Sequence, residues 1–436
     1  MSLDALIDRP LALRARQLLT MIPRGDAPRT RPDPANLDAL RQRDADVVGL
    51  IEDGLVLVKE GLITYAGPWA GRPTLDADAE VIEVACITPG WIDCHTHAVF
   101  AGSRHEEFTL RNLGARYLDI LNAGGGIHAS VESVRRASRA SLTDQLIHRC
   151  FDFTRQGVTT VEVKSGYGLS TDEELKQLRA IEDARGEVLV DLQATFLGAH
   201  VVPKKYRDRR ADYVDLLCAE MIPRVAERRL ARFCDVFCDQ GAFDAAEAER
   251  ILRAGLDHGL IPRIHADELS EAGCAEVALA VGAASADHLE FVSEAAIGAM
   301  AAAGVVAVLL PAVNLFLQVD RHAPARALLE AGVDVALSTD FNPGTAMTQD
   351  IGLILTLACT GYGMTPGEAL LGITRAAARA LRLEDRGTLA AGLRADLTIL
   401  GVEDYWQIPY FPGRRPIDGV VKAGELVYWQ SATEVD

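Results

Sequence analysis

Eight short apolar segments, each followed by a helix-like stretch, are the feature that most constrains the fold of this 436-residue chain. Each segment has the length of a single strand, and the stretches between them have the length and polarity of surface helices. The segments span residues 86–97, 157–166, 188–200, 232–239, 261–268, 284–290, 305–311 and 334–340. Eight successive strand–helix units predict a parallel barrel with its helices outside. A doubly wound open sheet is the alternative, but no glycine-rich phosphate fingerprint follows the first strand.

The two ends of the chain have a different pattern. From Leu55 to Pro89, and again in GTLAAGLRADLTILG and GVVKAGELVYW near the C-terminus, short apolar runs alternate with glycine turns, which is typical of β-hairpins. We therefore predict an α/β protein with a (β/α)8 TIM-like barrel over residues 89–384. A small β-sandwich domain would be assembled from residues 1–88 and 385–436. Residues 26–46, rich in Pro, Asp and Arg, predict an exposed loop with a short helical piece.

Charge and composition limit the possible partners. The formal net charge of −18 argues against nucleic acid and anionic membranes, and it means that an anionic substrate needs a positive group of its own. No stretch is apolar enough for a membrane span, and the N-terminal MSLDALIDRP lacks the pattern of a signal peptide.

The eight cysteines are scattered without metal-site spacing, so we expect them to be small buried apolar residues in a reducing compartment. We expect a cytoplasmic protein.

Metal-competent residues stand at the carboxyl ends of the predicted strands, where barrel enzymes place their active sites. His95 and His97, two apart on the first strand, point to the same face and can hold one borderline metal ion. Asp340 ends the eighth strand, which lies beside the first once the barrel closes, and His265 on the fifth strand adds a third imidazole. Such a set leaves room for a water molecule, whose pKa the metal lowers towards neutrality.

The sequence predicts one metal ion rather than two. Two-metal barrel hydrolases bridge their ions with a modified lysine from the fourth strand, and that strand, RFCDVFCD, contains no lysine. Lys164, on the second strand, is interpreted as a structural or substrate-orienting residue.

Two further polar residues have the right positions for catalysis. Glu268, three residues after His265, is within reach of the activated water and would act as general base, later returning the proton to the leaving nitrogen. Its alternative role is the N-terminal carboxylate of the helix that follows. His288, at the sixth strand end, could orient the water or stabilise the developing oxyanion. No role is assigned to His105, His128, His148, His258 and His322.

Several motifs in order make a family resemblance. DCHTHAVFAGSRHEEF, AGGGIHASV, TTVEVKSGYGLS, ATFLGAHVVP, HADEL, SADHLE and STDFNPG together resemble the imidazolonepropionase family of the amidohydrolase superfamily, which acts in histidine degradation. The resemblance implies hydrolysis of the ring amide of 4-imidazolone-5-propanoate to N-formimidoyl-L-glutamate, with one Zn²⁺ or Fe³⁺ per chain. The segments TAMTQDIGLILTLACT and VLLPAVNLFLQ depart from the family pattern beside the expected substrate pocket.

The resemblance also assigns roles to individual residues. It implies that the metal ligands are His95, His97, His265 and Asp340, that Glu268, His288 and Asp340 are catalytic, and that the substrate is bound by Arg104, Tyr167, His200, Glu268, Asn342, Gly344 and Thr345. Arg104 would hold the propionate carboxylate, since a guanidinium binds a carboxylate through two hydrogen bonds. We expect a small-molecule substrate that carries a carboxylate and an imidazolone ring, and a homodimer, the commonest assembly.

Two other interpretations use the same residues. A mononuclear deaminase of the same superfamily would keep the metal ligands, Glu268 and His288, but a neutral nucleobase offers no carboxylate to Arg104. A non-catalytic metal-binding scaffold would need neither Glu268 nor His288, because neither is required merely to hold the metal.

Overall fold

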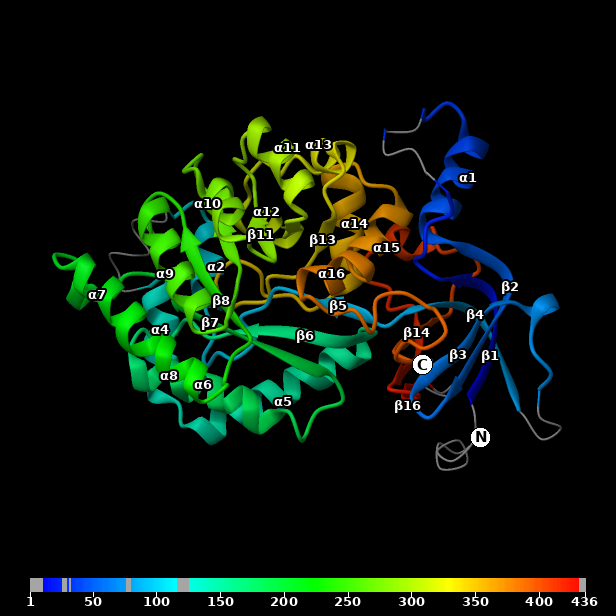
Figure 1. Cartoon of the computed structure of the whole chain (residues 1–436), viewed down its shortest axis with the longest axis horizontal. Helices are drawn as coiled ribbons and strands as arrows, with labels where there is room; N and C mark the ends of the chain where they lie inside the picture. Colours follow the sequence, from blue (N-terminus) through cyan, green and yellow to red (C-terminus); the bar gives the residue numbers. More distant parts are fainter. Residues whose placement is uncertain (1–10, 26–29, 31–32, 76–79, 116–124, 431–436) are drawn as a thin grey trace.

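The structure is a computed structural model that describes residues 11–25, 30, 33–75, 80–115 and 125–430. The first ten residues, where we expect no signal peptide, lie outside the described residues, as do the first two of the AGGGIHASV motif. The chain divides into a barrel and a separate sheet made of strands from both of its ends (Figure 1).

The barrel contains all eight predicted strands. They pair in parallel, in chain order, and β9 (Ile261–Pro262) extends the fifth segment by pairing with β8. The strands are β5 (Trp91–Asp93), β6 (Val158–Lys164), β7 (Asp191–Ala199), β8 (Phe233–Cys238), β10 (Ile264–Ala266), β11 (Ser285–His288), β12 (Val306–Leu309) and β13 (Val335–Leu337). Each predicted segment contains one of them, so the prediction of a parallel barrel is confirmed.

The barrel closes between its first and last strands through loop residues. Backbone N–H groups of Asp340 and His97 donate to the carbonyl oxygens of His95 and Phe341, at 3.1 and 3.0 Å. Below them, the buried carboxylate of Asp93 accepts hydrogen bonds from the hydroxyls of Ser338 and Thr339. These contacts join the end of β5 to the end of β13, so the barrel is nearly closed although these two strands form no ladder.

Helices surround the barrel, and local sequence accounts for their ends. α6 (Thr171–Ala184) begins after Ser170 with three acidic residues in its first turn, which suit the positive end of the helix dipole. α9 (Ala245–Asp257) begins with a capping box between Asp244 and Glu247. α11 (Glu294–Ala303) ends at Gly304 in the left-handed conformation, which glycine adopts readily. Further α-helices of the described residues are α2 (His105–Asn112), α4 (Ile127–Arg136), α5 (Arg139–Arg155), α7 (Arg210–Leu216), α8 (Ile222–Glu227), α10 (Cys274–Val281), α12 (Pro311–Leu317), α13 (Ala325–Ala331), α14 (Ile351–Tyr362), α15 (Pro366–Gly372), α16 (Arg375–Ala380) and α17 (Gln407–Tyr410).

The second sheet has seven strands in the order β16-β15-β14-β4-β1-β2-β3. They are β1 (Leu11–Leu19), β2 (Leu50–Lys59), β3 (Leu62–Pro68), β4 (Val81–Pro89), β14 (Leu397–Leu400), β15 (Ile417–Lys422) and β16 (Glu425–Trp429). The central pairing of β14 with β4 joins the C-terminal strands to the N-terminal ones. The hairpin patterns at the two ends of the sequence therefore belong to one sheet.

The predicted first barrel strand, residues 86–97, is divided between the two sheets at Gly90. β4 ends at Pro89 in the terminal sheet, and β5 begins at Trp91 in the barrel. A Cβ atom at Gly90 would lie only 2.4 Å from Thr159 Oγ1, so the chain crosses from one sheet to the other too close to β6 for a larger residue.

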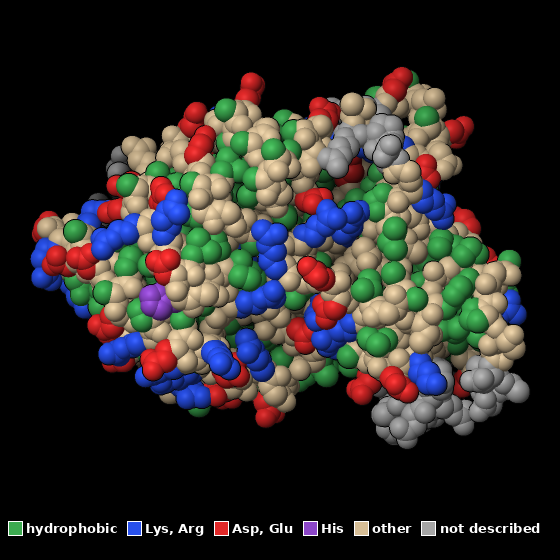
Figure 2. Space-filling view, viewed as in Figure 1, with side chains coloured by type: hydrophobic (Ala, Val, Ile, Leu, Met, Phe, Trp, Pro, Cys, Tyr) green, Lys and Arg blue, Asp and Glu red, His purple; other side chains and the backbone are tan. Residues whose placement is uncertain are grey.

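Ion pairs link the terminal sheet to the barrel. Lys422 Nζ on β15 lies 2.8 Å from an oxygen of Asp191, the first residue of β7, and 2.9 Å from one of Asp396. Arg386 also contacts both carboxylates. On the face shown in Figure 2, basic and acidic side chains are interspersed over both units. Among the described residues, no helix is both long and apolar enough to cross a membrane.

One pair of cysteines departs from the expectation of free thiols. Cys238, the last residue of β8, and Cys274, the first of α10, form a disulfide with their Cα atoms 5.8 Å apart. The expectation is wrong for this pair because residues 36 apart in sequence meet where β8 ends beside the start of α10. Cys86, Cys94, Cys150, Cys218, Cys234 and Cys359 are free.

Helix α1 (Leu37–Val48) is longer than the short helical piece predicted within residues 26–46, and it is fixed by a buried carboxylate. Asp44 accepts hydrogen bonds from the Thr365 hydroxyl and the Gly367 N–H at the start of α15. It also accepts them from the Tyr405 hydroxyl and the Trp406 indole N–H, at 3.1 and 2.8 Å. Asp44 thus joins the N-terminal segment to the barrel and to the C-terminal segment.

Replacing Asp44 by alanine should destabilise the protein, because it leaves buried N–H and O–H donors without an acceptor. We expect Asp44→Ala to lower the free energy of unfolding by about 2–4 kcal/mol, measured by urea denaturation. Asp38→Ala, at an exposed position of the same helix, should change it by less than about 1 kcal/mol. Equal stabilities of the two variants would contradict this role of Asp44.

Candidate metal centre and active site

The carboxyl ends of the first and eighth strands bring three predicted metal ligands together. The Nε2 atoms of His95 and His97 lie 3.5 and 3.3 Å from Asp340 Oδ1, and all three side chains are buried. His265 faces them from β10, with its ring centroid 4.5 Å from that of His95. His95 and His265 also form a compact group with His288, in which each residue offers a ligand atom within 4.8 Å of the others. The structure therefore gathers the four predicted ligands and His288 at one point.

Several atoms that face this point lack a hydrogen-bond partner in the described part of the chain. They include His95 Nε2, His265 Nε2 and Asp340 Oδ1, all of which are buried. Buried polar atoms are normally satisfied, so a cluster of unsatisfied ones marks a position where a ligand can bind. Imidazole nitrogens together with one carboxylate oxygen are a donor set that suits zinc or iron. The residues thus fit a bound metal ion.

Two buried carboxylates orient the imidazoles of His95 and His265 through their Nδ1 atoms. Asp287 Oδ2 lies 2.6 Å from His95 Nδ1, and Asp235 Oδ1 lies 3.1 Å from His265 Nδ1. A carboxylate at Nδ1 favours the tautomer that carries its proton there, which leaves the Nε2 lone pair free for a metal. Sequence reasoning did not identify Asp235 or Asp287; for Asp235 the available signal was an acidic residue inside the otherwise apolar strand β8.

A layer of buried charges lies beneath the imidazoles. Lys164 Nζ lies 2.9 Å from Glu162 and 2.8 Å from Asp235, while Arg263 Nη2 lies 3.0 Å from Asp287. All five side chains are fully buried. Burial alone would lower the pKa of Lys164, but the charges of Asp235 and Glu162 raise it above its ordinary value. Lys164 therefore holds carboxylates in place, which favours its structural interpretation.

Burial also sets the charge state of the histidines. It lowers the pKa values of His95, His97 and His288 well below the ordinary value, with smaller contributions from neighbouring positive groups. These imidazoles are therefore neutral at pH 7, and the neutral form is the one that binds a metal ion.

Glu268 lies beside His288 at the mouth of the barrel. Its Oε2 is 3.7 Å from His288 Nε2. Burial, followed by the neighbouring carboxylate of Glu290, raises the pKa of Glu268 well above its ordinary value. The alternative role as a helix-terminal carboxylate is wrong: α10 begins only at Cys274, and Asp267 accepts the backbone N–H groups of Ala272, Cys274 and Ala275.

The backbone at these strand ends is strained. Asp267, His288 and Asp340 have φ angles of 53°, 77° and 51°, in a region that non-glycine residues rarely adopt. Such conformations persist where the surrounding structure enforces them, and they occur often at functional sites.

Two predicted substrate-binding residues border the metal cluster. The ring of His200 stacks on that of His97, with their centroids 5.1 Å apart. The ring centroid of Tyr167 lies 5.4 Å from that of His200. His200 Nδ1 is 3.1 Å from the Gly166 carbonyl oxygen. Burial, followed by the charge of Asp340, raises the pKa of Tyr167, although the charge of Arg104 acts in the opposite direction.

The segment after Asp340 forms a turn held by Asn342. The Asn342 amide donates to Asp340 Oδ2 at 3.0 Å and to Thr345 Oγ1 at 2.8 Å. Its Oδ1 accepts the backbone N–H groups of Gly344 and Thr345. Arg104 packs against this turn, because a Cβ atom at Gly344 would lie 2.1 Å from Arg104 Nη1. The turn therefore connects the metal cluster to the predicted carboxylate-binding arginine.

Two charged residues near this region were not identified from the sequence. Glu290, two residues after the end of β11, is buried, and both of its carboxylate oxygens lack a hydrogen-bond partner among the described residues. Arg111, on α2, donates to the Gly344 carbonyl oxygen at 2.9 Å. Both residues could have been found from their positions in the sequence. Glu290 follows His288 by two residues, and Arg111 follows Arg104 by seven.

Comparison with known proteins adds independent information. A sequence profile described as "Amidohydrolase family" matches residues 113–428. The imidazolonepropionase of Myxococcus xanthus is 46% identical over 397 residues, covering 90% of this chain and 92% of its own. The imidazolonepropionase of Geobacillus kaustophilus is 45% identical over 430 residues, and the match covers 96% of this chain and 98% of its own.

Solved structures with lower sequence identity share the fold. A zinc-bound adenosine deaminase from Xanthomonas campestris has a TM-score of 0.67 at 19% identity, covering 95% of this chain and 92% of its own. A 5-methylcytosine deaminase from Klebsiella pneumoniae has a TM-score of 0.68 at 18% identity, and the match covers 98% of this chain and 99% of its own. These likenesses show the fold alone.

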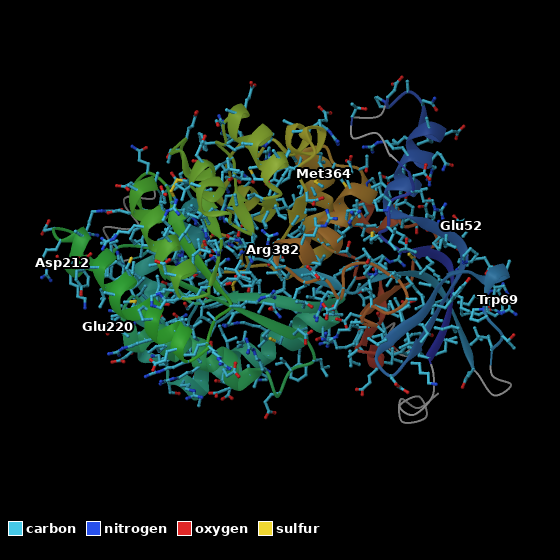
Figure 3. All side chains as sticks on the ribbon, viewed as in Figure 1. Glu52, Trp69, Asp212, Glu220, Met364 and Arg382 are labelled. Carbon is cyan, nitrogen blue, oxygen red and sulfur yellow. A yellow bond between two sulfur atoms is a disulfide. The ribbon has the colours of Figure 1, made fainter. Side chains whose placement is uncertain are left out.

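Removing the charge of Asp235 should weaken metal binding, because His265 loses the carboxylate that fixes its tautomer. We expect Asp235→Asn to lower the affinity for Zn²⁺ by about ten- to a hundredfold, measured by competition with a chromogenic chelator. Asp212→Asn, on α7 at the end of the molecule far from the terminal sheet (Figure 3), is the control and should bind metal like the unmodified protein. Unchanged affinity in Asp235→Asn would contradict the orienting role.

Proposed function

Because this chain belongs to the imidazolonepropionases of the amidohydrolase family, we propose that it hydrolyses the ring amide of 4-imidazolone-5-propanoate to N-formimidoyl-L-glutamate. The observation that carries the proposal is the convergence, at one barrel mouth, of a metal-competent His/Asp cluster, a Glu268–His288 pair and Arg104. We further propose one Zn²⁺ or Fe³⁺ per chain, held by His95, His97, His265 and Asp340. When bound, such an ion polarises a carbonyl group and lowers the pKa of water, so that a nucleophile is available at neutral pH.

Glu268 is the proposed general base. Its carboxylate is largely buried, with Oε2 3.7 Å from His288 Nε2, and burial raises its pKa above the ordinary value, which favours the uptake of a proton. Glu268 would accept a proton from water as the oxygen adds to the ring carbonyl carbon. It would return that proton to the ring nitrogen as the carbon–nitrogen bond breaks. The second proton of the water stays on the new carboxyl group, which releases it to solvent, so that the products are a carboxylate and a formimidoyl group.

His288 and the residues around the mouth would position the substrate. A neutral His288 can place one N–H towards the carbonyl oxygen, where negative charge develops in the transition state. Tyr167 and His200 lie on the His97 side and would contact the ring. Arg104 would bind the propionate carboxylate beside Gly344. The hydrogen bonds of Asn342 to Asp340 and Thr345 would hold the Asp340 carboxylate and this turn in fixed positions.

The proposal extends to organisation and location. We propose that residues 89–384 form the catalytic unit and that residues 1–88 and 385–436 form the supporting unit, since the two sheets divide the strands in this way. We also propose a homodimer in the cytoplasm. Size-exclusion chromatography with light scattering tests the dimer, and a monomeric mass would contradict it.

A direct assay tests the activity. Purified protein should accelerate the ultraviolet decay of freshly generated 4-imidazolone-5-propanoate, and metal analysis of the same sample should give about one ion per chain. No acceleration by a fully metal-loaded sample would contradict the substrate and direct the search to deaminase substrates.

Glu268→Gln should separate catalysis from metal binding. The amide cannot accept the proton, so we expect turnover to fall by about a hundred- to ten-thousandfold while metal content and fold are unchanged. Turnover is measured by the ultraviolet assay, metal content by elemental analysis and fold by circular dichroism. Glu271→Gln, at an exposed position of the same loop, is the matched control and should keep full activity. Near-normal turnover in Glu268→Gln would remove Glu268 as the base.

A further inference from the structure

One face of α2 presents an arginine pair to the turn that follows Asp340. Glu107 and Arg111 are four residues apart on one face of α2, and Arg104, the N-cap residue of the helix, precedes Glu107 by three residues and is hydrogen-bonded to it. Arg104 Nη1 lies against Gly344, and Arg111 Nη2 donates to the Gly344 carbonyl oxygen at 2.9 Å. Both guanidinium groups therefore flank the same residue.

Arg104 is already paired with a carboxylate. Its Nε and Nη2 donate to Glu107 Oε2 at 3.0 and 2.7 Å, and both side chains are largely buried. The other Glu107 oxygen accepts the Gly126 N–H at 3.0 Å, which fixes the carboxylate in place. Arg104 and Glu107 together carry no net charge, so this pair alone offers little electrostatic attraction to an anion.

Arg111 supplies the charge that the pair lacks. In the part of the chain that the structure describes, its guanidinium donates to the neutral Gly344 carbonyl, and its buried Nε has no partner. Burial and then the positive charge of Arg104 disfavour the charged form of Arg111, so its pKa is lowered. A positive charge that is partly buried beside another positive charge is stabilised when an anion binds between them.

The position of Arg111 relative to the cluster fits a substrate with two functional ends. Gly344 is linked through the Asn342 side chain to Asp340, the carboxylate of the metal cluster. A compact molecule whose ring lies at the cluster would therefore extend its carboxylate towards the arginines at Gly344.

We propose that Arg111 is a second carboxylate-binding residue that, together with Arg104, selects substrates with a short anionic side chain. This inference rests on the proposed function, because it concerns the propionate end of the same substrate. Glu107 holds Arg104 in place and Arg104 gives directional hydrogen bonds. Arg111 gives the net positive charge and an Nε–H donor that has no partner among the described residues. An acidic protein with a formal net charge of −18 needs such a local excess of positive charge to bind an anion.

The competing explanation is that Arg111 only supports the Gly344 turn, and two substitutions separate the two roles. Arg111→Gln removes the charge but retains an N–H donor for the Gly344 carbonyl. Arg111→Lys retains the charge but loses the planar guanidinium. Arg136→Gln, which removes an exposed arginine on α4, is the matched control for a change in net charge.

Steady-state kinetics on the metal-loaded enzyme with 4-imidazolone-5-propanoate gives the first readout. We expect Arg111→Gln to raise KM by about ten- to a hundredfold with kcat within about threefold, Arg111→Lys to recover most of the loss, and Arg136→Gln to match the unmodified enzyme. A KM for Arg111→Gln within about twofold of the unmodified value, or a fall in kcat at unchanged KM, would overturn the proposal.

Calorimetric titration with glutarate, a plain dicarboxylate, gives a second readout that needs no turnover. Glutarate should bind the unmodified holoenzyme and bind Arg111→Gln at least about tenfold more weakly. If the unmodified enzyme hydrolyses no imidazolone, the proposed function fails and glutarate binding alone decides the role of Arg111. Equal binding by the two proteins, or no binding by either, would overturn that role.

Discussion

The hydrogen bonds of the buried carboxylate of Asp93 are the interaction on which the site depends. Asp93 ends β5 and accepts hydrogen bonds from the hydroxyls of Ser338 and Thr339, which follow β13. Ser338 Oγ in turn accepts the backbone N–H of His95 at 2.7 Å. Since β5 and β13 share no ladder, these side-chain contacts bring the first and last strands together. They also fix the His95–His97 segment against Asp340, and burial raises the pKa of Asp93 to about 6.

Above this closure, the site is built from groups that are costly to bury and therefore rely on one another. Lys164 and Arg263 pair with Glu162, Asp235 and Asp287, and two of these carboxylates hold the imidazoles of His265 and His95. Removing one member of such a buried network leaves an uncompensated charge. The same packed surroundings hold the backbone of Asp267, His288 and Asp340 in its strained conformation.

Much of this arrangement was predictable from the sequence, and the reasons can be stated residue by residue. His95 and His97 share a face because strand side chains alternate, and Asp340 joins them because an eight-stranded barrel places its last strand beside its first. Other features had no signal in the sequence. Glu268 and Asp267 are adjacent acids, and only the structure shows that Asp267 caps α10 while Glu268 turns towards His288. Cys238 and Cys274 were expected to be free, because the contact between the end of β8 and the start of α10 is not visible in a linear pattern.

The sequence by itself therefore determined the number and order of barrel strands, the family, and the residue types that stand at the strand ends. These follow from local periodicity and from motifs read in order, which do not depend on distant contacts. Only the tertiary structure decided which carboxylates lie behind which imidazoles, how β4 and β5 divide one apolar segment at Gly90, and that Arg111 meets Arg104 at Gly344. Those outcomes depend on side-chain directions and on packing between residues far apart in sequence, because charges and donors are satisfied only by neighbours that the folded chain brings within hydrogen-bond distance.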